Sequence, residues 1–158
     1  MVTKKDKTET GIAKETGVKK AAPEKKETAK AAKDGFPKLA LIRIRGMINV
    51  KQDIRYTLFN LRLRKNNACV VIENSPANRS AAAKCKDYIA YGEITEDTYN
   101  ELVDKRGKKD EDGALKKFFL LHPPIGGFEK RGIKIPFSKR GALGYRGEKM
   151  NELVKKML

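Results

Sequence analysis

The side chains that carry out catalysis or bind metals are scarce in this sequence. His122 is the only histidine, and Cys69 and Cys85 lack the paired spacing of a zinc site. A nucleophile activated by histidine would have to use His122, which stands before two prolines at the end of a predicted strand. We therefore predict no catalytic residue, no metal site and no cofactor. Both cysteines are expected to be small buried thiols of a cytoplasmic protein.

Net charge is the more informative property of this chain. The 158 residues include 36 Lys and Arg against 20 Asp and Glu, a formal net charge of +16. Such an excess favours a polyanionic partner, which could be RNA, DNA or an anionic membrane surface, although charge can also serve solubility alone. No apolar run approaches the roughly 20 residues of a membrane span, and the N-terminus lacks the hydrophobic core of a signal peptide. We therefore expect no membrane partner.

Short strands and helices alternate in the predicted folded part, which begins near Pro37. Apolar patterning predicts strands at 38–46, 68–74, 91–95 and 115–121, and helices at 49–65, 79–90, 96–106 and 148–158. Asn49 with Gln52 is the predicted capping box of the first helix, and Asn78 and Thr95 are the predicted N-caps of the next two. The order predicts an α/β (α+β) domain with a small sheet of three or four strands and helices on one face.

Composition divides the chain into three predicted parts. Residues 1–34 have ten Lys, six acidic residues and no aromatic side chain, which predicts a basic low-complexity arm that cannot order itself. Residues 35–121 form the predicted core. Residues 122–158 form a basic, glycine-rich extension that ends in an amphipathic helix. Its loop, 122–147, holds six glycines and six Lys or Arg against one acid, Glu129. Loops of this length are usually functional or disordered.

Basic side chains from several elements are expected to form an RNA-binding surface. They lie on the first strand, along the first helix, in the turn after it, at the start of the second helix, where backbone N–H groups favour anions, and in 122–147. The predicted RNA-binding residues are Arg43, Arg45, Lys51, Arg55, Arg62, Arg64, Lys65, Asn66, Asn67, Arg79, His122, Lys130, Arg131, Lys134, Lys139, Arg140, Tyr145 and Arg146. The three aromatics of the loop, Phe128, Phe137 and Tyr145, could stack on unpaired bases or pin the loop to the core. No DNA-binding motif is evident, so DNA is not expected.

Two separated blocks of the sequence carry a family resemblance. They are FNLRLRKNNACVVIENSPANRSAAAKCKDYIAYGEI (59–94) and HPPIGGFEKRGIKIPFSKRGALGYRGEKMNELVKKML (122–158). Over about 37–158 the chain resembles the L-thirty family of large-subunit ribosomal proteins, called L-seven in eukaryotes, and the second block resembles the extension of its archaeal members. The HPP–GGF and LGYRGEK pieces are the most specific parts of the match.

The resemblance implies a ferredoxin-like core in a structural protein of the large ribosomal subunit, located in the cytoplasm. It also implies binding to large-subunit rRNA near 5S rRNA, with 5S rRNA as a further candidate partner. Neighbouring ribosomal proteins are expected contacts, and the chain is expected to be a monomer within the ribosome. Glu129 departs from the expected pattern, because a basic side chain would suit contact with an RNA phosphate better at that position. The alternatives are a free RNA-binding regulator or RNA chaperone with the same fold, and a small ferredoxin-like enzyme that uses His122 and Glu73.

Overall fold

The computed structural model describes residues 38–111 and 113–158, so the predicted arm at 1–34 lies outside the described residues. The described part contains one five-stranded sheet with the order β4-β2-β1-β3-β5. The strands are β1 (Lys38–Arg43), β2 (Ala68–Glu73), β3 (Ile89–Glu93), β4 (Phe119–Leu120) and β5 (Gly144–Tyr145). The helices are α1 (Gln52–Asn60), α2 (Pro76–Lys84), α3 (Glu96–Arg106) and α4 (Met150–Met157), with 3-10 turns at Phe137–Lys139 and Gly147–Lys149. None of the helices in these two ranges is long and apolar enough to cross a membrane.

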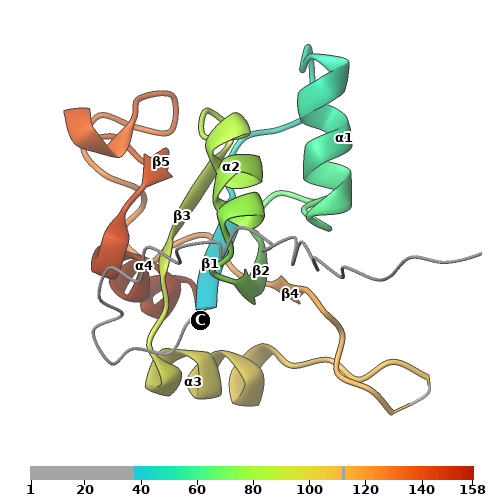
Figure 1. Ribbon diagram of the computed structural model, residues 1–158. Helices are drawn as coiled ribbons and strands as arrows, with labels where there is room; N and C mark the ends of the chain where they lie inside the picture. The colour runs from blue at the N-terminus through green and yellow to red at the C-terminus, as the bar shows by residue number, and fades with distance from the viewer. Residues whose placement is uncertain (1–37, 112) are drawn as a thin grey trace, which may run out of the picture. The chain divides into compact units, whose positions relative to one another are not determined.

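The central strand β1 pairs antiparallel with β2 on one side and with β3 on the other. Its side chains alternate between the two faces of the sheet, and both faces are buried. Leu39 and Leu41 pack with Leu58 of α1 and with Ala82 of α2. The opposite face carries Ala40 and Ile42, which belong to the cluster formed by α3 and α4. The α+β, ferredoxin-like class is confirmed, but the helices cover both faces instead of one (Figure 1).

Helix ends differ from the sequence predictions at α1 and α2. Lys51 is the N-cap residue of α1, and Asn49 has a φ of 57°, so the predicted capping box does not form. Asn tolerates this left-handed conformation, which turns the chain before the helix begins. In α2 the N-cap is Ser75, whose side chain accepts a hydrogen bond from the Asn78 N–H at 3.2 Å. Pro at the first helical position removes an N–H that would have no partner, so the helix starts before Asn78.

The C-terminal extension returns to the same sheet. Its strand β5 pairs in parallel with β3, where Ala90 faces Gly144 and Tyr91 faces Tyr145. The apolar stripe predicted for the last helix is confirmed, because Met150, Leu153, Val154 and Met157 are all buried. These residues share one cluster with β1 and α3. We therefore propose that the extension and the core fold as one unit.

Substituting Ala at Gly92 should test this junction. A Cβ at Gly92 of β3 would meet the Gly147 carbonyl oxygen inside van der Waals contact and the Met150 Cβ at 2.9 Å. Backbone cannot yield as a flexible side chain would, so Gly92→Ala should lower the free energy of unfolding by about 1–3 kcal/mol. Urea denaturation measures this change.

The matched control is Gly46→Ala, since a Cβ at Gly46 has no atom within 4 Å. That change should leave stability unaltered or raise it by up to about 1 kcal/mol. Equal effects of the two substitutions would contradict the close packing of β3 against the extension.

Candidate nucleic-acid interface

The turn after α1 holds the densest group of predicted RNA-binding residues. The helix ends at Asn60, and Arg62 then adopts a left-handed conformation with a φ of 60°. Leu63 is fully buried and its N–H donates to the Leu58 carbonyl at 2.9 Å. Because Leu63 points inward, Arg62 and Arg64 on either side of it are exposed, and so are the next two residues, Lys65 and Asn66. One buried leucine thus presents several cationic side chains to solvent.

Arg43 lies beneath this turn and is only 2% exposed. Its Nε donates to the Arg45 carbonyl at 2.8 Å, and its Nη1 donates to the carbonyls of Leu63 at 3.1 Å and Arg64 at 2.6 Å. The Asn67 N–H donates back to the Arg43 carbonyl at 2.7 Å. Burial lowers the pKa of Arg43. The strand alternation placed Arg43 on the expected face, but α1 and α2 cover that face. Arg43 therefore positions the turn and is not available at the surface for RNA.

A cavity of about 580 Å³ opens beside the turn. Its lining residues, which define the basic–aromatic cavity, are Phe59, Asn60, Arg62, Arg64, Lys65, Ala68, Phe118 and Leu120. Ala68 of β2 pairs with Leu120 of β4, so the ladder between these strands contributes an apolar part of the lining. Phe59 is 50% exposed and Phe118 is 36% exposed. The Arg64 guanidinium lies over the Phe59 ring, 4.1 Å from its centroid.

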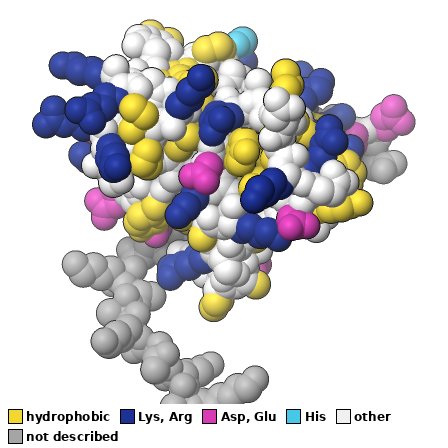
Figure 2. Space-filling view, turned by 90° about the horizontal axis from the view of Figure 1, so that it is seen from above, with side chains coloured by type: hydrophobic (Ala, Val, Ile, Leu, Met, Phe, Trp, Pro, Cys, Tyr) yellow, Lys and Arg dark blue, Asp and Glu magenta, His cyan; other side chains and the backbone are white. Residues whose placement is uncertain are grey.

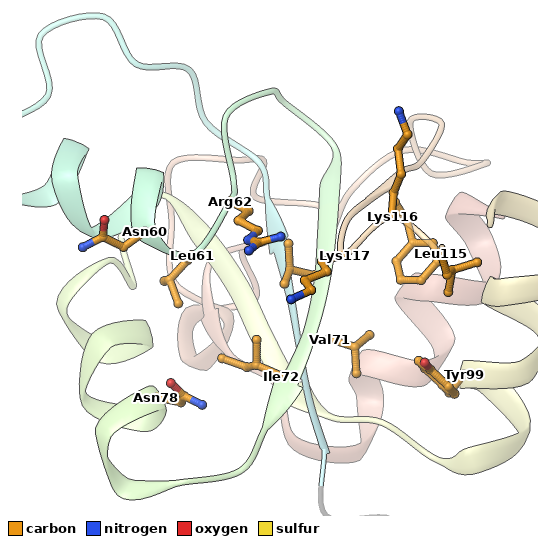
Figure 3. Close-up of a pocket in the computed structure, with 12 residues that line it drawn as sticks. Asn60, Leu61, Arg62, Val71, Ile72, Asn78, Tyr99, Leu115, Lys116 and Lys117 are labelled. Atoms are coloured by element: carbon orange, nitrogen blue, oxygen red, sulfur yellow. The ribbon is translucent and has the colours of Figure 1, made fainter. Parts of the chain in front are cut away.

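A second cavity, of about 400 Å³, shares Asn60 and Arg62 with the first. Figure 3 shows the cationic groups of Arg62 and Lys117 reaching toward the space over Val71 and Ile72. Lys116 points away from that space, and its Nζ pairs with an Asp110 carboxylate oxygen at 3.1 Å. Arg62 thus belongs to the lining of both cavities. Lys117 adds a positive charge to the second cavity, and it was not among the predicted RNA-binding residues.

Lys51, Arg55 and Arg62 were predicted to share one face of the first helix, at 49–65, and this face forms only in part. Lys51 and Arg55 are exposed at the start of α1, but Arg62 lies beyond the end of the helix. The left-handed turn carries Arg62 to the two cavities instead. The basic residues around α1 therefore form two groups, one at each end of the helix.

Two further predicted residues have partners within the protein. The Arg45 guanidinium lies 5.0 Å from the Tyr88 ring centroid and donates to the Asp87 carbonyl at 3.1 Å, and its side chain is half-buried. Arg79, in α2, is exposed and its Nε donates to Oδ1 of Asn74. These contacts orient both guanidinium groups and leave them accessible at least in part.

The extension carries a second exposed basic group. Its members are Lys130, Arg131, Lys134, Lys139 and Arg140. The segment is held by backbone hydrogen bonds, including Phe137 N–H to the Leu143 carbonyl at 2.7 Å and Leu143 N–H to the Ile135 carbonyl at 3.2 Å. Figure 2 shows Lys and Arg spread over one face of the molecule and densest on the left, the side where Figure 1 places the extension.

Arg146 is a buried member of the same segment. It is 6% exposed, and its two terminal nitrogens donate to the two carboxylate oxygens of Glu129 at 2.5 and 2.6 Å. Its Nη2 also donates to the Ala142 carbonyl at 3.0 Å, and its guanidinium lies 4.7 Å from the Phe137 ring centroid. The Arg146 guanidinium is therefore occupied by contacts within the protein and is not displayed at the surface. The acidic residue at 129, which departed from the expected basic pattern, is the counter-charge that makes this burial possible.

The three aromatic residues of the extension differ in exposure. Phe128 packs against the main cluster, and Phe137 is half-buried over Arg146. Tyr145 is 55% exposed, and its hydroxyl donates to the Glu93 carboxylate at 2.8 Å. Burial, this hydrogen bond and the Glu93 charge raise the pKa of Tyr145 to about 12. Of the three rings, that of Tyr145 is the most accessible for stacking.

The remaining reactive groups are placed as follows. His122 is exposed, and its backbone N–H donates to the Met157 carbonyl at 3.1 Å. Cys69 and Cys85 are buried free thiols, as predicted, and burial raises the pKa of Cys69 to about 12. Within 38–111 and 113–158, no group of His, Cys, Asp and Glu side chains is arranged to hold a metal ion.

The aromatic side chains of the candidate interface were not predicted from the sequence. Phe59 lies outside the apolar stripe of its helix, which is formed by Ile54, Leu58 and Leu61, so its exposure could have been predicted from the helical period. Phe118 and Phe119 are adjacent in an extended segment and must point to opposite sides, and Phe119 is the buried one. That Phe59 and Phe118 line the same cavity could not be predicted, because it depends on the pairing of β2 with β4.

Comparison with known proteins identifies the family. Residues 39–89 match the family described as ribosomal protein L30p/L7e. A Methanopyrus kandleri protein is 34% identical to this chain, and the match covers 73% of this chain and 100% of the relative. Proteins of Methanococcus maripaludis (35% identical; 75% of this chain and 98% of the relative) and Staphylothermus marinus (39%; 75% and 97%) are similar too. All three are named large ribosomal subunit protein uL30. The chain belongs to the uL30 family.

The resemblance stated from sequence is thus confirmed. The uL30 relatives are matched along nearly all of their length, so the likeness is not confined to 39–89.

Glu129→Gln should reveal the buried ion pair through its pH dependence. Although burial alone would raise the pKa of Glu129, hydrogen bonds and charge from Arg146 lower it below its ordinary 4.5. The stabilisation is therefore complete above pH 4.5 and is lost as the pH falls through the lower, folded-state pKa. At neutral pH the variant should lose about 3 kcal/mol, the lower end for a broken buried pair, because the Glu129 side chain is 30% exposed.

Urea denaturation from neutral pH to below pH 4.5 measures the difference in the free energy of unfolding between wild type and variant. As a control, Glu148→Gln removes an exposed carboxylate of the same extension and should change stability by less than about 0.5 kcal/mol. A difference between wild type and Glu129→Gln that is independent of pH would rule out the ion pair as its source.

Proposed function

We propose that this chain is a structural constituent of the large ribosomal subunit that binds and stabilises large-subunit rRNA. The observation that carries the proposal is the extended match to uL30 proteins, which are named as constituents of that subunit. It is supported by the exposure of most of the predicted RNA-binding residues at the end of α1 and along the extension.

The proposed mode of binding is electrostatic and shape-dependent. Lys and Arg side chains contact phosphates and release condensed counterions, so the affinity falls as salt rises. The turn after α1 and the extension are both held by backbone hydrogen bonds, which present their charges in a fixed arrangement. A fixed pattern of charges suits folded RNA, whose irregular backbone is recognised by shape.

The proposed partners are large-subunit rRNA and neighbouring ribosomal proteins, with one copy of the chain per ribosome in the cytoplasm. At the finer level we propose contacts near 5S rRNA and with 5S rRNA itself, which rest on the family resemblance. The role is proposed to be non-catalytic. His122 and Glu73, the residues of the enzyme alternative, are both exposed, and neither lines the two cavities beside the turn after α1.

Two triple substitutions with the same change of net charge test where the RNA-binding surface lies. The first, Lys130→Gln with Lys134→Gln and Lys139→Gln, removes three exposed charges from the extension. The second, Lys105→Gln with Lys108→Gln and Lys109→Gln, removes three exposed charges near the end of α3. Binding to a large-subunit rRNA transcript is measured at several salt concentrations. The extension variant should bind more weakly, and its salt slope should fall by roughly 1 for each phosphate that the variant no longer neutralises.

The α3 variant controls for net charge and should bind nearly as the wild type does. Equal weakening of the two variants would mean that charge alone matters, and would contradict a defined surface on the extension. Failure of the wild type to co-sediment with large subunits at physiological salt would contradict the proposed function as a whole. Repeating the titration with 5S rRNA tests the finer proposal separately.

A further inference from the structure

The basic–aromatic cavity combines two features that solvated surfaces rarely place together. The rings of Phe59 and Phe118 are partly exposed, and they come from segments far apart in the sequence. Three cationic side chains, Arg62, Arg64 and Lys65, belong to the same lining. None of the described residues that line the cavity is acidic. A volume of about 580 Å³ lies within the usual range for small-molecule and cofactor sites.

The chemistry of this lining indicates a flat, aromatic and negatively charged ligand. A flat ligand has three planar groups on which to stack, namely the Phe59 ring, the Phe118 ring and the Arg64 guanidinium. The side-chain amide of Asn60 can donate and accept hydrogen bonds, as the edge of a base requires. Arg62 and Lys65 supply the positive charge that a phosphate needs.

We propose that the basic–aromatic cavity holds one unpaired nucleotide of the bound RNA. Its base stacks on the Phe118 ring and on the Phe59–Arg64 pair, and its phosphate is held by Arg62 and Lys65. This inference rests on the proposed function, because it specifies how part of the rRNA is bound. It adds a site that recognises a single extruded base, where phosphate contacts alone would recognise only the backbone.

The backbone around the cavity is organised before any ligand arrives. Arg43 donates to the carbonyls of Leu63 and Arg64, and the buried Leu63 side chain anchors the turn between the two exposed arginines. The contact between Arg64 and the Phe59 ring already orients the guanidinium. Fixing these groups in advance reduces the conformational entropy that binding would otherwise cost. A preformed cavity is what a single inserted base requires.

A neighbouring protein could instead insert an apolar side chain into the basic–aromatic cavity. The charges argue for RNA, since Arg62, Arg64 and Lys65 at the cavity would favour an anion over an apolar group. The described lining also holds no acidic side chain that would repel a phosphate. RNA is therefore the occupant that this surface fits best, and a protein side chain becomes an outcome of the test.

Replacing both rings by leucine should remove stacking while retaining apolar volume. The double variant Phe59→Leu/Phe118→Leu is compared with Tyr56→Leu, which alters a 61% exposed ring of the same helix that does not line the cavity. The ligands are a short single-stranded oligoribonucleotide containing 2-aminopurine, a perfect RNA duplex of equal length, and a large-subunit rRNA transcript. The protein contains no Trp, so 2-aminopurine fluorescence can be followed without that background. Circular dichroism checks that each variant is folded.

The double variant should bind the single strand at least about fivefold more weakly than wild type and no longer quench 2-aminopurine. Its affinity for the duplex should change by less than about twofold, and Tyr56→Leu should resemble wild type with both ligands. Unchanged single-strand affinity, equal weakening with both ligands, or no single-strand binding by wild type would overturn the nucleotide site. If the rRNA transcript still bound wild type in any of these cases, the proposed function would stand and the cavity would be assigned to a protein neighbour. Failure of wild type to bind the transcript as well would overturn both proposals.

Discussion

The hydrogen bonds of the buried Arg43 guanidinium are the interaction on which much of the described structure depends. They join the end of the central strand to the turn after α1, through the carbonyls of Leu63 and Arg64. Burying a guanidinium is costly unless its N–H groups are satisfied, so the backbone must come to it. The same bonds that satisfy Arg43 therefore fix the turn that displays Arg62 and Arg64. The buried Arg43 thereby fixes the backbone that carries the exposed Arg62 and Arg64.

Arg146 plays the corresponding part in the extension. It follows β5 directly, and its guanidinium bonds to Glu129 and to the Ala142 carbonyl while it covers the Phe137 ring. The peptide N–H of Arg146 also donates to the Tyr91 carbonyl at 2.9 Å, which ties the segment to β3. In both places the arginine side chain joins segments that are well separated in the sequence. Two of the cationic side chains of this chain, whose net charge is +16, are thus buried and stabilise the fold.

Periodicity predicted α3 and α4 closely, but the helices predicted at 49–65 and 79–90 run past the observed ends of α1 at Asn60 and α2 at Lys84. The helix ending at Arg106 and the stripe from Met150 to Met157 were both expected, because apolar spacing and charged ends define them locally. The capping of α1 was wrong, since Asn49 adopts a left-handed turn that its residue type allows but does not require.

The sequence indicated which residue types the candidate interface would contain, but it did not indicate which of those residues would be exposed. Arg43 and Arg146 have the same residue type as Arg62 and Arg140, and only tertiary packing decides which are buried. The second helical layer over Leu39 and Leu41 covers Arg43, and Glu129 neutralises Arg146 from a distance of 17 residues in the chain. The placement of Phe59 and Phe118 in one cavity lining depends likewise on strand pairing, which no local pattern specifies.

The two outermost strands of the sheet have a consequence for how this protein behaves before it meets a partner. β4 and β5 are each only two residues long, so β4 pairs with only Ala68 and Cys69 of β2, and β5 pairs with only Ala90 and Tyr91 of β3. Lys116 and Lys117 precede β4 and add like charges along that edge. Short edge strands and lysines beside an edge both disfavour pairing of this sheet with the sheet of a second copy.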